Sequence, residues 1–265
     1  MTNLPINQII CGDCLEVMKE FPDNSIDMVL CDLPYHATSC NWDQTIPLDI
    51  LWRQYKRIIK DNRVIVLTST QPFTTDLINS NRDWFKYEWI WYKNFGANFV
   101  QAKRQPLKYH ENMLVFSKSH HVYNPIFEEY SDSFKKSFES KEGHVRKREY
   151  KPDYIYKIKP KDQVYSLKRG RYPISVRQIK GVQRANNTRL HPTQKPVELF
   201  EYLIKTYTNE GDLVLDNCIG SGTTAIAAMN TNRNYIGIEK EQKYVDIANK
   251  RIKESKQQIN IFEET

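Results

Sequence analysis

The sequence lacks any apolar run long enough to cross a membrane. Its N-terminus, MTNLPINQII, also lacks the basic segment and apolar stretch of a secretory signal. These absences argue against a membrane partner and predict a cytoplasmic protein. The chain has 265 residues, of which 40% are hydrophobic, enough for one large domain or one domain with an insertion.

Cysteine is scarce and odd in number, and with no export signal this argues against disulfides. Cys11 and Cys14 have zinc-like spacing, with Cys31 and Cys40 nearby and Cys218 far along the chain. No second close pair follows them. We therefore predict no metal site and interpret the cysteines as small buried apolar residues.

Acidic residues are deficient in one segment. Residues 119–190 contain 17 Lys and Arg against 8 Asp and Glu, a net charge of +9, while the rest of the chain has a net charge of −2. The segment also holds seven of the 16 tyrosines. Interleaved basic and aromatic residues are typical of nucleic-acid binding, although a solvated insertion gives the same composition.

Strand and helix patterns alternate on both sides of this segment. Strands are predicted at 8–11, 26–31, 64–67, 87–92, 113–116, 213–215 and 235–238, and helices at 15–21, 48–60, 71–79, 197–207, 224–229 and 242–255. Such alternation predicts an α/β fold, with a mostly parallel sheet and helices on both faces. Residues 119–190 lack sustained apolar periodicity and are predicted to be an insertion.

A glycine-rich loop follows the predicted strand 213–215. Gly220 and Gly222 allow close approach of a ligand to the backbone, and the next helix presents its N-terminus to an anionic group. Glu239 ends the following strand, where an acid can accept both hydroxyls of a ribose. The spacing also fits a dinucleotide fingerprint or a ligand-free turn, and Glu239 is equally placed to cap a helix.

Two motifs together resemble those of the amino-methyltransferases of DNA. The first is Asp32-Leu33-Pro34-Tyr35, which resembles the catalytic motif of that family. The second, residues 216–223, reads DNCIGSGT and resembles its S-adenosylmethionine motif. The order of the two motifs, with the basic segment between them, is that of the beta group.

The resemblance implies a Rossmann-like class I methyltransferase sheet that is circularly permuted and carries an inserted target-recognition region. Residues 1–118 would form the catalytic half, 119–190 the recognition insertion, and 191–265 the cofactor-binding half. The segments HENMLVFSK at 110–118 and HPTQKP at 191–196 also resemble segments of this family.

The resemblance also implies how the catalytic corner acts. Asp32 and the backbone carbonyl of Leu33 would accept hydrogen bonds from the amino group of a target base, with Tyr35 stacked on the base and Pro34 stiffening the corner. Because this amine is inaccessible inside a duplex, the base must be flipped out or single-stranded. Leu33 departs from the family's proline but retains the carbonyl.

Members of the family that this sequence resembles mostly act on adenine when the first corner residue is aspartate, so the resemblance implies N6 of adenine as the target, and N4 of cytosine remains the alternative. Methylation at carbon 5 of cytosine is not expected, because no proline of this sequence is followed by cysteine.

The cofactor site implied by the resemblance combines residues from both halves of the chain. Asp13 would bind the adenine amine, Glu239 the ribose, the glycine loop the methionine part, and Asp216 the methionine amine or the loop itself. Lys195 lies near the expected methionine carboxylate, and a surface lysine at a helix start is an equal alternative. The predicted cofactor residues are Asp13, Cys14, Thr193, Lys195, Asp216, Asn217, Cys218, Gly220, Ser221, Gly222, Thr223 and Glu239.

Cys218 and Asn217 replace the family's phenylalanine and proline. The smaller side chain at 218 is expected to weaken contact with the adenine ring of the cofactor.

The basic segment would contact DNA through phosphates and base edges. The predicted DNA-binding residues are Arg146, Lys147, Arg148, Lys168, Arg169, Arg171, Arg177 and Arg184. The resemblance also suggests a cognate restriction endonuclease as a functional partner and is compatible with a homodimer. The competing hypotheses are an NAD-dependent oxidoreductase and a DNA-binding module without catalytic activity.

Overall fold

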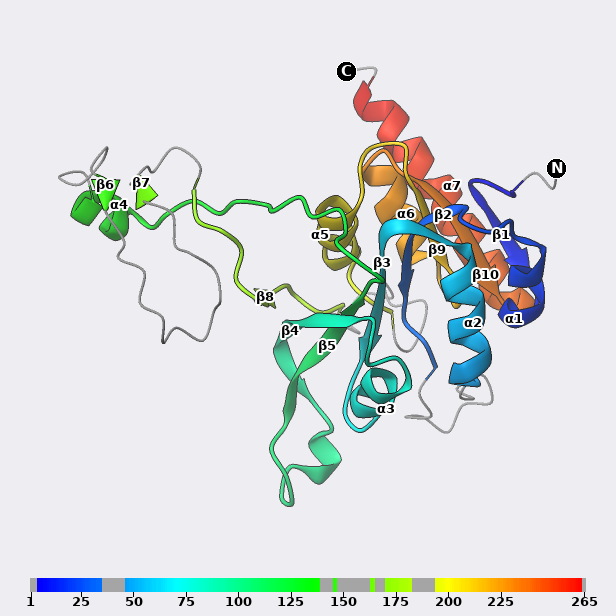
Figure 1. Ribbon diagram of the computed structural model, residues 1–265, viewed down its shortest axis with the longest axis horizontal. Helices are drawn as coiled ribbons and strands as arrows, with labels where there is room; N and C mark the ends of the chain where they lie inside the picture. Colours follow the sequence, from blue (N-terminus) through cyan, green and yellow to red (C-terminus); the bar gives the residue numbers. More distant parts are fainter. Residues whose placement is uncertain are drawn as a thin grey trace. The chain divides into compact units, whose positions relative to one another are not determined.

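The computed structural model describes residues 4–34, 46–138, 145–146, 163–164, 170–182 and 194–263. By internal contacts the chain divides into two compact units, Met1–Asn124 with Ser175–Thr265, and Pro125–Ile174. The first unit contains an eight-stranded sheet in the order β1-β10-β9-β2-β3-β5-β4-β8 (Figure 1).

The strands of this sheet come from both ends of the sequence. They are β1 (Gln8–Cys11), β2 (Ile26–Cys31), β3 (Ile59–Ser69), β4 (Phe85–Ala97), β5 (Lys108–Phe116), β8 (Val176–Gln178), β9 (Leu213–Asp216) and β10 (Asn234–Glu239). Its helices are α1 (Cys14–Val17), η1 (Met18–Glu20), α2 (Leu48–Ile58), α3 (Phe73–Ser80), η2 (Phe99–Gln101), α5 (Val197–Tyr207), α6 (Thr223–Asn230) and α7 (Gln242–Glu263).

Five strands, β1, β10, β9, β2 and β3, pair in parallel. Every residue of β2 and β9 is buried, as expected for parallel strands covered on both faces. Strand β2 pairs with β9, which lies nearly 200 residues away in the sequence. Strands from the N-terminal and C-terminal parts of the chain therefore belong to one sheet. The predicted α/β class and permuted order are thereby confirmed.

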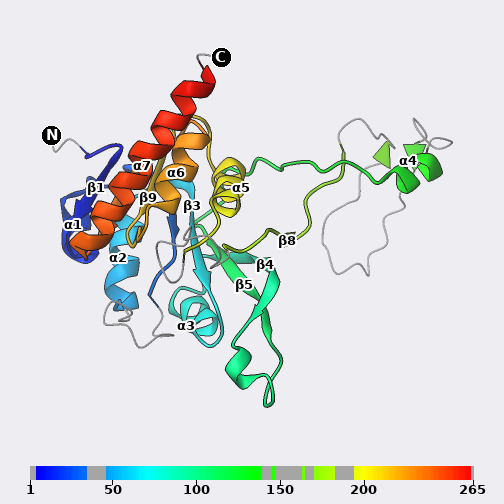
Figure 2. The same cartoon turned by 180° about the vertical axis from the view of Figure 1, so that it is seen from behind.

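Helices cover both faces of the sheet. Helix α6 contacts both α5 and α7, and these three helices cover the strands β2, β9, β10 and β1. Helices α1, α2 and α3 pack against one another on the opposite face, as the two opposite views show (Figures 1 and 2). Helix α2 buries Leu51, Trp52, Tyr55 and Ile58, the apolar stripe that predicted it.

The remaining strands extend the sheet. Strand β5 pairs antiparallel with β3 and with β4, and β8 pairs in parallel with the outer side of β4. Strands β4 and β5 continue past the sheet as a long hairpin whose tip is the short helix η2 (Figure 1). Only 87–92 and 113–116 were predicted as strands here, because the projecting part of the hairpin is exposed and has no apolar pattern.

Other boundaries differ from the predictions by a few residues. Helix α2 ends at Ile58, where β3 begins, instead of continuing to residue 60. Helix α3 begins at Phe73, after a cis peptide bond between Gln71 and Pro72. Helix α7 continues to Glu263, beyond the predicted end at residue 255.

The second unit contains α4 (Asp132–Phe138) and the short strands β6 (Val145–Arg146) and β7 (Gln163–Val164), which pair antiparallel. Residues 119–124 and 175–182, which lie within the predicted insertion, group with the sheet unit instead. None of the helices among the described residues is long and apolar enough to span a membrane.

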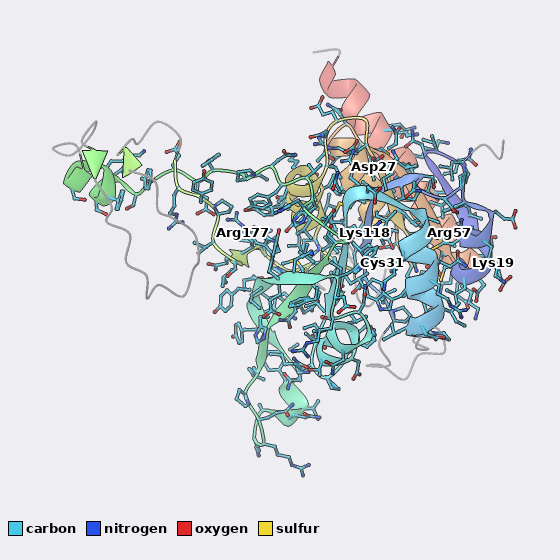
Figure 3. The ribbon with its side chains drawn as sticks, in the orientation of Figure 1. Lys19, Asp27, Cys31, Arg57, Lys118 and Arg177 are labelled. Carbon is cyan, nitrogen blue, oxygen red and sulfur yellow. The ribbon has the colours of Figure 1, made fainter. Side chains whose placement is uncertain are left out.

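The two ends of β2 have different surroundings (Figure 3). Asp27, near the start of the strand, is buried and pairs with Lys60 at 2.8 Å and Arg63 at 2.9 Å. Cys31 ends the strand at the opposite edge, and Asp32 follows it there.

Candidate active site

The carboxyl ends of the parallel strands bring the two predicted motifs to one edge of the sheet. Cys31 at the end of β2 pairs in register with Leu67 of β3, and Cys11 at the end of β1 pairs with Glu239 at the end of β10. Asp216 ends β9, between β10 and β2. Ligands of open α/β sheets bind at this edge.

Asp32 is held by two donors from different elements. The hydroxyl of Thr68, near the end of β3, donates to Oδ1 of Asp32. The ammonium of Lys195 donates to Oδ2 at 2.5 Å. Burial raises the pKa of Asp32, and the positive charge of Lys195 opposes that rise. Lys195 therefore favours the ionised form of the Asp32 carboxylate at a site that excludes most of the solvent.

A second pair of charges extends this cluster. Oε2 of Glu111 on β5 lies 3.4 Å from the same Lys195 ammonium, and Oε1 of Glu111 accepts a hydrogen bond from Lys93 of β4 at 2.9 Å. The four side chains are between 5% and 18% exposed. Burial raises the pKa of Glu111, and the two lysines outweigh it, so the pKa is lowered overall. Two carboxylates and two ammoniums thus cancel one another in a buried site.

Lys195 also connects this cluster to the glycine-rich loop. Its backbone carbonyl accepts a hydrogen bond from the hydroxyl of Thr223 at 3.4 Å, at the start of α6. The side chain and main chain of one residue therefore contact both predicted motifs. From the sequence, Lys195 was expected near a cofactor carboxylate, which remains a prediction, and its contact with Asp32 was not anticipated.

The glycine loop depends on backbone conformations that favour glycine. Gly220 has φ 52° and Gly222 has φ 83°. Gly222 is the N-cap of α6 and has no side chain, so it gives the amide groups of the first turn no side-chain acceptor, as suits a helix start that binds an anionic ligand. Arg251 of α7 donates to the carbonyl of Ser221 at 2.5 Å and to its hydroxyl at 3.0 Å, which fixes the loop.

Glu239 is tied to the same loop. Its Oε2 accepts from the backbone N–H of Gly220 at 3.0 Å, and its Oε1 accepts from that of Glu241 at 2.9 Å. Burial raises the pKa of its carboxyl group, and these two hydrogen bonds oppose the rise. Glu239 is therefore an oriented carboxylate at the tip of β10 rather than a freely solvated one.

Asp216 is buried beneath the loop. One of its oxygens accepts from the backbone N–H of Cys218 at 3.0 Å, and the other accepts from the hydroxyl of Thr224. Burial raises the pKa of Asp216 to about 7, although both hydrogen bonds oppose that shift. Asp216 thus fixes the first turn of the loop and is able to change its charge near neutral pH.

Three thiols interact beside this carboxylate. Interaction with Cys218 lowers the pKa of Cys14, while the pKa of Cys218 is raised by its interactions with Cys14 and Cys31. Burial raises the pKa of Cys31 to about 12. Asn217 accepts a hydrogen bond from the buried hydroxyl of Tyr55 at 2.5 Å, so replacement of the family's proline gives a contact to α2.

The predicted cofactor residue Asp13 is the N-cap of α1. Its Oδ1 accepts a hydrogen bond from the backbone N–H of Leu15 at 2.9 Å. Among the described residues no hydrogen bond reaches its second oxygen, which is therefore available to a ligand. Leu33 is buried and Pro34 is half-buried at the corner after β2. Tyr35 and Thr193 lie outside the described residues.

Few of the predicted DNA-binding residues can be placed. Arg171 pairs with Glu128 in the second unit. Arg177 on β8 lies over the ring of Tyr202, 4.3 Å from its centroid, and Figure 3 shows it near β8. Arg146 belongs to β6, without a described side chain, and Lys147, Arg148, Lys168, Arg169 and Arg184 lie outside the described residues.

Four residues of the site were not predicted from the sequence: Thr68, Lys93, Glu111 and Tyr55. Glu111 lies in a segment whose resemblance to the methyltransferases was recognised, yet no role was assigned to it. Thr68 and Lys93 gave no signal, because a threonine at a strand end and a lysine within a strand are common.

Comparison with known proteins decides the family. The sequence profile of a family described as DNA methylase, with N6 and N4 methyltransferases in its name, matches residues 26–250. That range includes the Asp32 corner, the insertion, the glycine loop and Glu239. The chain belongs to this DNA methylase family.

Proteins named type II methyltransferases are found among similar sequences. The type II methyltransferase M.HinfI of Haemophilus influenzae is 29% identical, over 97% of this chain and 71% of its own. The type II methyltransferase M1.MboII of Moraxella bovis is 27% identical, over 93% of this chain and 96% of its own.

Solved structures of DNA methyltransferases share the fold. The M1.HpyAVI–SAM complex has a TM-score of 0.61 and 24% identity, over 92% of this chain and 98% of that one. The cytosine-N4-specific PvuII DNA methyltransferase has a TM-score of 0.62 and 18% identity, over 91% and 84% of the two chains. The α/β methyltransferase fold of this DNA methylase is thus confirmed.

Proposed function

We propose that this protein transfers a methyl group from S-adenosylmethionine to the N6 amino group of a flipped-out adenine in DNA. The observation that carries this proposal is the double contact of Lys195, with Asp32 through its side chain and with Thr223 through its main chain. An acceptor for an amino group and a loop suited to a cofactor therefore share one edge of the sheet.

The residues around the loop fit the chemistry of S-adenosylmethionine. The open N-terminus of α6 suits the carboxylate of its methionine part, and the second oxygen of Asp13 suits the amino group of adenine. Glu239 suits the ribose hydroxyls and Asp216 the methionine amine. The fold is shared with M1.HpyAVI, whose structure was solved as a complex with SAM, and this likeness supports the assignment.

When bound, S-adenosylmethionine supplies an electrophilic methyl group on a sulfonium. The lone pair of an adenine amine is conjugated with the ring, so the amine is a weak nucleophile. Asp32 and the carbonyl of Leu33 accept hydrogen bonds from its two N–H groups and orient the lone pair for in-line attack. Each oxygen of Asp32 has a second lone pair for this purpose, beside Thr68 or Lys195.

The carboxylate of Asp32 also stabilises the positive charge that develops on the attacking nitrogen. It can accept the surplus proton from that nitrogen when the reaction is complete. Both tasks require an ionised Asp32, which is the form that Lys195 favours in this buried site. Tyr35 would stack on the extruded base, as expected from the sequence.

The target base is identified by mass. Purified protein is incubated with labelled S-adenosylmethionine and unmethylated DNA, and the product is digested to nucleosides for mass spectrometry. N6-methyldeoxyadenosine is expected, and N4-methyldeoxycytidine would overturn the choice of adenine. The N4-cytosine alternative is kept because the fold is shared with a cytosine-N4-specific enzyme.

The role of Asp32 is tested by Asp32→Ala. This variant is expected to lose methyl transfer at least a thousandfold while binding DNA and S-adenosylmethionine almost as the parent does, because it removes an acceptor of the reacting amine. Asp61→Ala is the matched control, since Asp61 is 74% exposed and pairs only loosely with Lys118 at 3.3 Å. Full activity of Asp32→Ala would refute the mechanism.

The similar proteins M.HinfI and M1.MboII are named type II methyltransferases. We therefore place this enzyme in a restriction-modification system with a cognate endonuclease. Protection of host DNA from one restriction enzyme after expression of this protein, lost in Asp32→Ala, is the expected result.

A further inference from the structure

The β4–β5 hairpin has a tip that no part of the described structure covers. Phe99 is 66% exposed and Val100 is fully exposed, although both are large apolar side chains. Exposed apolar side chains that stand together at the end of a projecting element mark an interaction site more often than chance. Figures 1 and 2 both show the hairpin extending past the sheet with η2 at its end.

The tip is an ordered turn. Asn98 has a left-handed backbone with φ 57°, and its side chain accepts from the backbone N–H of Lys108 across the hairpin at 3.0 Å. Backbone hydrogen bonds from Gln101 to Asn98 at 2.9 Å and from Arg104 to Gln101 at 2.8 Å continue the turn. Phe99 and Val100 are thus presented on a preorganised support, which lowers the entropy cost of binding.

The stem is stiffened in the same way. The rings of Tyr92 and Tyr109 stack with centroids 5.9 Å apart, and Gly96 lies so close to Tyr109 and Leu107 that a Cβ atom at 96 would clash with them. On the other side, the backbone N–H of Gly181 donates to Asn94 at 3.0 Å. The hairpin therefore projects as a firm element.

The charge of the hairpin selects the kind of partner. Residues 94–110 contain Lys103, Arg104 and Lys108 but no aspartate or glutamate. All three basic side chains are exposed. A basic element with an apolar tip is complementary to a polyanion with a stacked apolar interior, which describes duplex DNA.

The position of the hairpin points to the same partner. Ser69, at the carboxyl end of β3, pairs with Asn112, so residues 93–109 continue past the sheet edge that carries Asp32. Glu111, at the base of the hairpin, belongs to the charge cluster around Asp32. Any duplex that delivers a base to Asp32 must lie over this edge, within reach of the hairpin.

We propose that the hairpin tip enters the DNA duplex, with Phe99 and Val100 filling the stack near the extruded base and Lys103 and Arg104 on the flanking phosphates. This inference rests on the proposed function and assigns a DNA contact outside the basic segment 119–190. Apolar wedges of this kind offset the loss of stacking when a base step is opened. Because extrusion of a paired base costs a few kcal/mol, the wedge matters most when the target base is paired.

The test uses the methylation site once sequencing of modified host DNA has located it. Two synthetic duplexes carry that site, one with the target base normally paired and one with it opposite an abasic position. Phe99→Ser/Val100→Ser is expected to slow methylation of the paired duplex tenfold or more and to regain a rate within about threefold of the parent on the abasic duplex. An equal loss on both duplexes, or no loss on either, would overturn the wedge.

The phosphate contacts are tested by salt dependence. Lys103→Ala/Arg104→Ala is expected to reduce the slope of log affinity against log salt concentration by about 2, since each neutralised phosphate contributes about 0.9. An unchanged slope would remove the hairpin from the DNA interface. Lys250→Ala/Lys253→Ala on α7 is the matched control with two charges lost, and its slope should equal that of the parent.

Two further comparisons distinguish the wedge from a general loss of apolar surface and from a dimer contact. Ile6 is 47% exposed and precedes β1, at the sheet edge opposite to the one that carries Asp32. Ile6→Ser removes this exposed apolar side chain and should not change the methylation rate of either duplex. If Phe99→Ser/Val100→Ser instead converts a dimer into a monomer in sedimentation and keeps the parent's preference between duplexes, the tip contacts a second copy and the proposal fails. If the unmodified protein methylates neither duplex, the proposed function itself fails.

Discussion

Replacement of Lys195 by methionine should change the pH dependence of this enzyme. Methionine retains much of the length and the apolar stem of lysine but removes the ammonium that contacts Oδ2 of Asp32 at 2.5 Å. Removal of one partner from a buried ion pair leaves the other charge uncompensated and costs about 3–5 kcal/mol. The side chains of Lys195 and Asp32 are 5% and 18% exposed, so solvent replaces little of that loss.

The variant can reduce this loss by protonating Asp32. In the parent protein, burial raises the pKa of Asp32 above that of the unfolded chain, and Lys195 limits the rise. In Lys195→Met the folded-state pKa rises further. An acid with a raised pKa in the folded state loses stability as pH rises through the window between its unfolded and folded values. The deficit in unfolding free energy relative to the parent should therefore be smallest at acidic pH and should increase as pH rises through the folded-state pKa of Asp32 in the variant.

The same shift should appear in catalysis. In the proposed mechanism Asp32 must be ionised to accept a hydrogen bond from the amine, so the rate of Lys195→Met should reach its half-maximum at a higher pH than in the parent. Near neutral pH we expect a rate below that of the parent, with partial recovery as pH rises. The measurements are transfer of labelled methyl groups at saturating substrate and urea unfolding, each over a pH series.

Lys93→Met is the matched control, because it removes a lysine of the same cluster that contacts Glu111 at 2.9 Å and leaves the contact between Lys195 and Asp32 in place. It should destabilise the protein without moving the activity profile. The reasoning would be refuted if Lys195→Met kept the parent's profile, or if both variants moved it equally.

Two further predictions concern stability. Asp27→Ala should lower the unfolding free energy by about 3–5 kcal/mol in urea titrations without affecting binding of S-adenosylmethionine, because Asp27 is 5% exposed and pairs with Lys60 and Arg63 at the other end of β2; a loss under 1 kcal/mol would contradict this. Asp216→Asn should remove a pH-dependent loss of unfolding free energy. The carboxyl group of Asp216 has a folded pKa of about 7 against an ordinary value of 3.8, so the parent loses about 4 kcal/mol of stability between pH 4 and 7. The stability of the parent relative to Asp216→Asn should therefore fall over this range, and equal pH dependence of the two proteins would exclude the assigned pKa.

The arrangement of the sheet could be predicted from the sequence because its signals are local. Apolar runs such as Ile26–Cys31 and the glycine loop after Leu213–Asp216 each mark where a parallel strand ends. Parallel strands share one carboxyl edge, so motifs nearly 200 residues apart were expected to meet there.

The charge cluster could not be predicted in the same way. The contact between Lys195 and Asp32 joins residues 163 positions apart and depends on how far one lysine side chain extends. Glu111 and Lys93 lie on neighbouring strands, and their pairing follows from the register of β4 and β5, which a pattern of apolar residues does not fix in an exposed hairpin. The length of that hairpin was missed for the same reason.

The neutrality of the cluster has a consequence for the reaction. Asp32 and Glu111 carry two negative charges, and Lys93 and Lys195 carry two positive ones, so the buried site can hold an ionised acceptor without a net charge. In the proposed reaction the target base enters as a neutral group and does not disturb this balance. Positive charge develops on its nitrogen only as the new bond forms, and Asp32 is already ionised and oriented when that happens. Because the ions are fixed before the substrate arrives, the site favours the charge distribution of the transition state over that of the bound base.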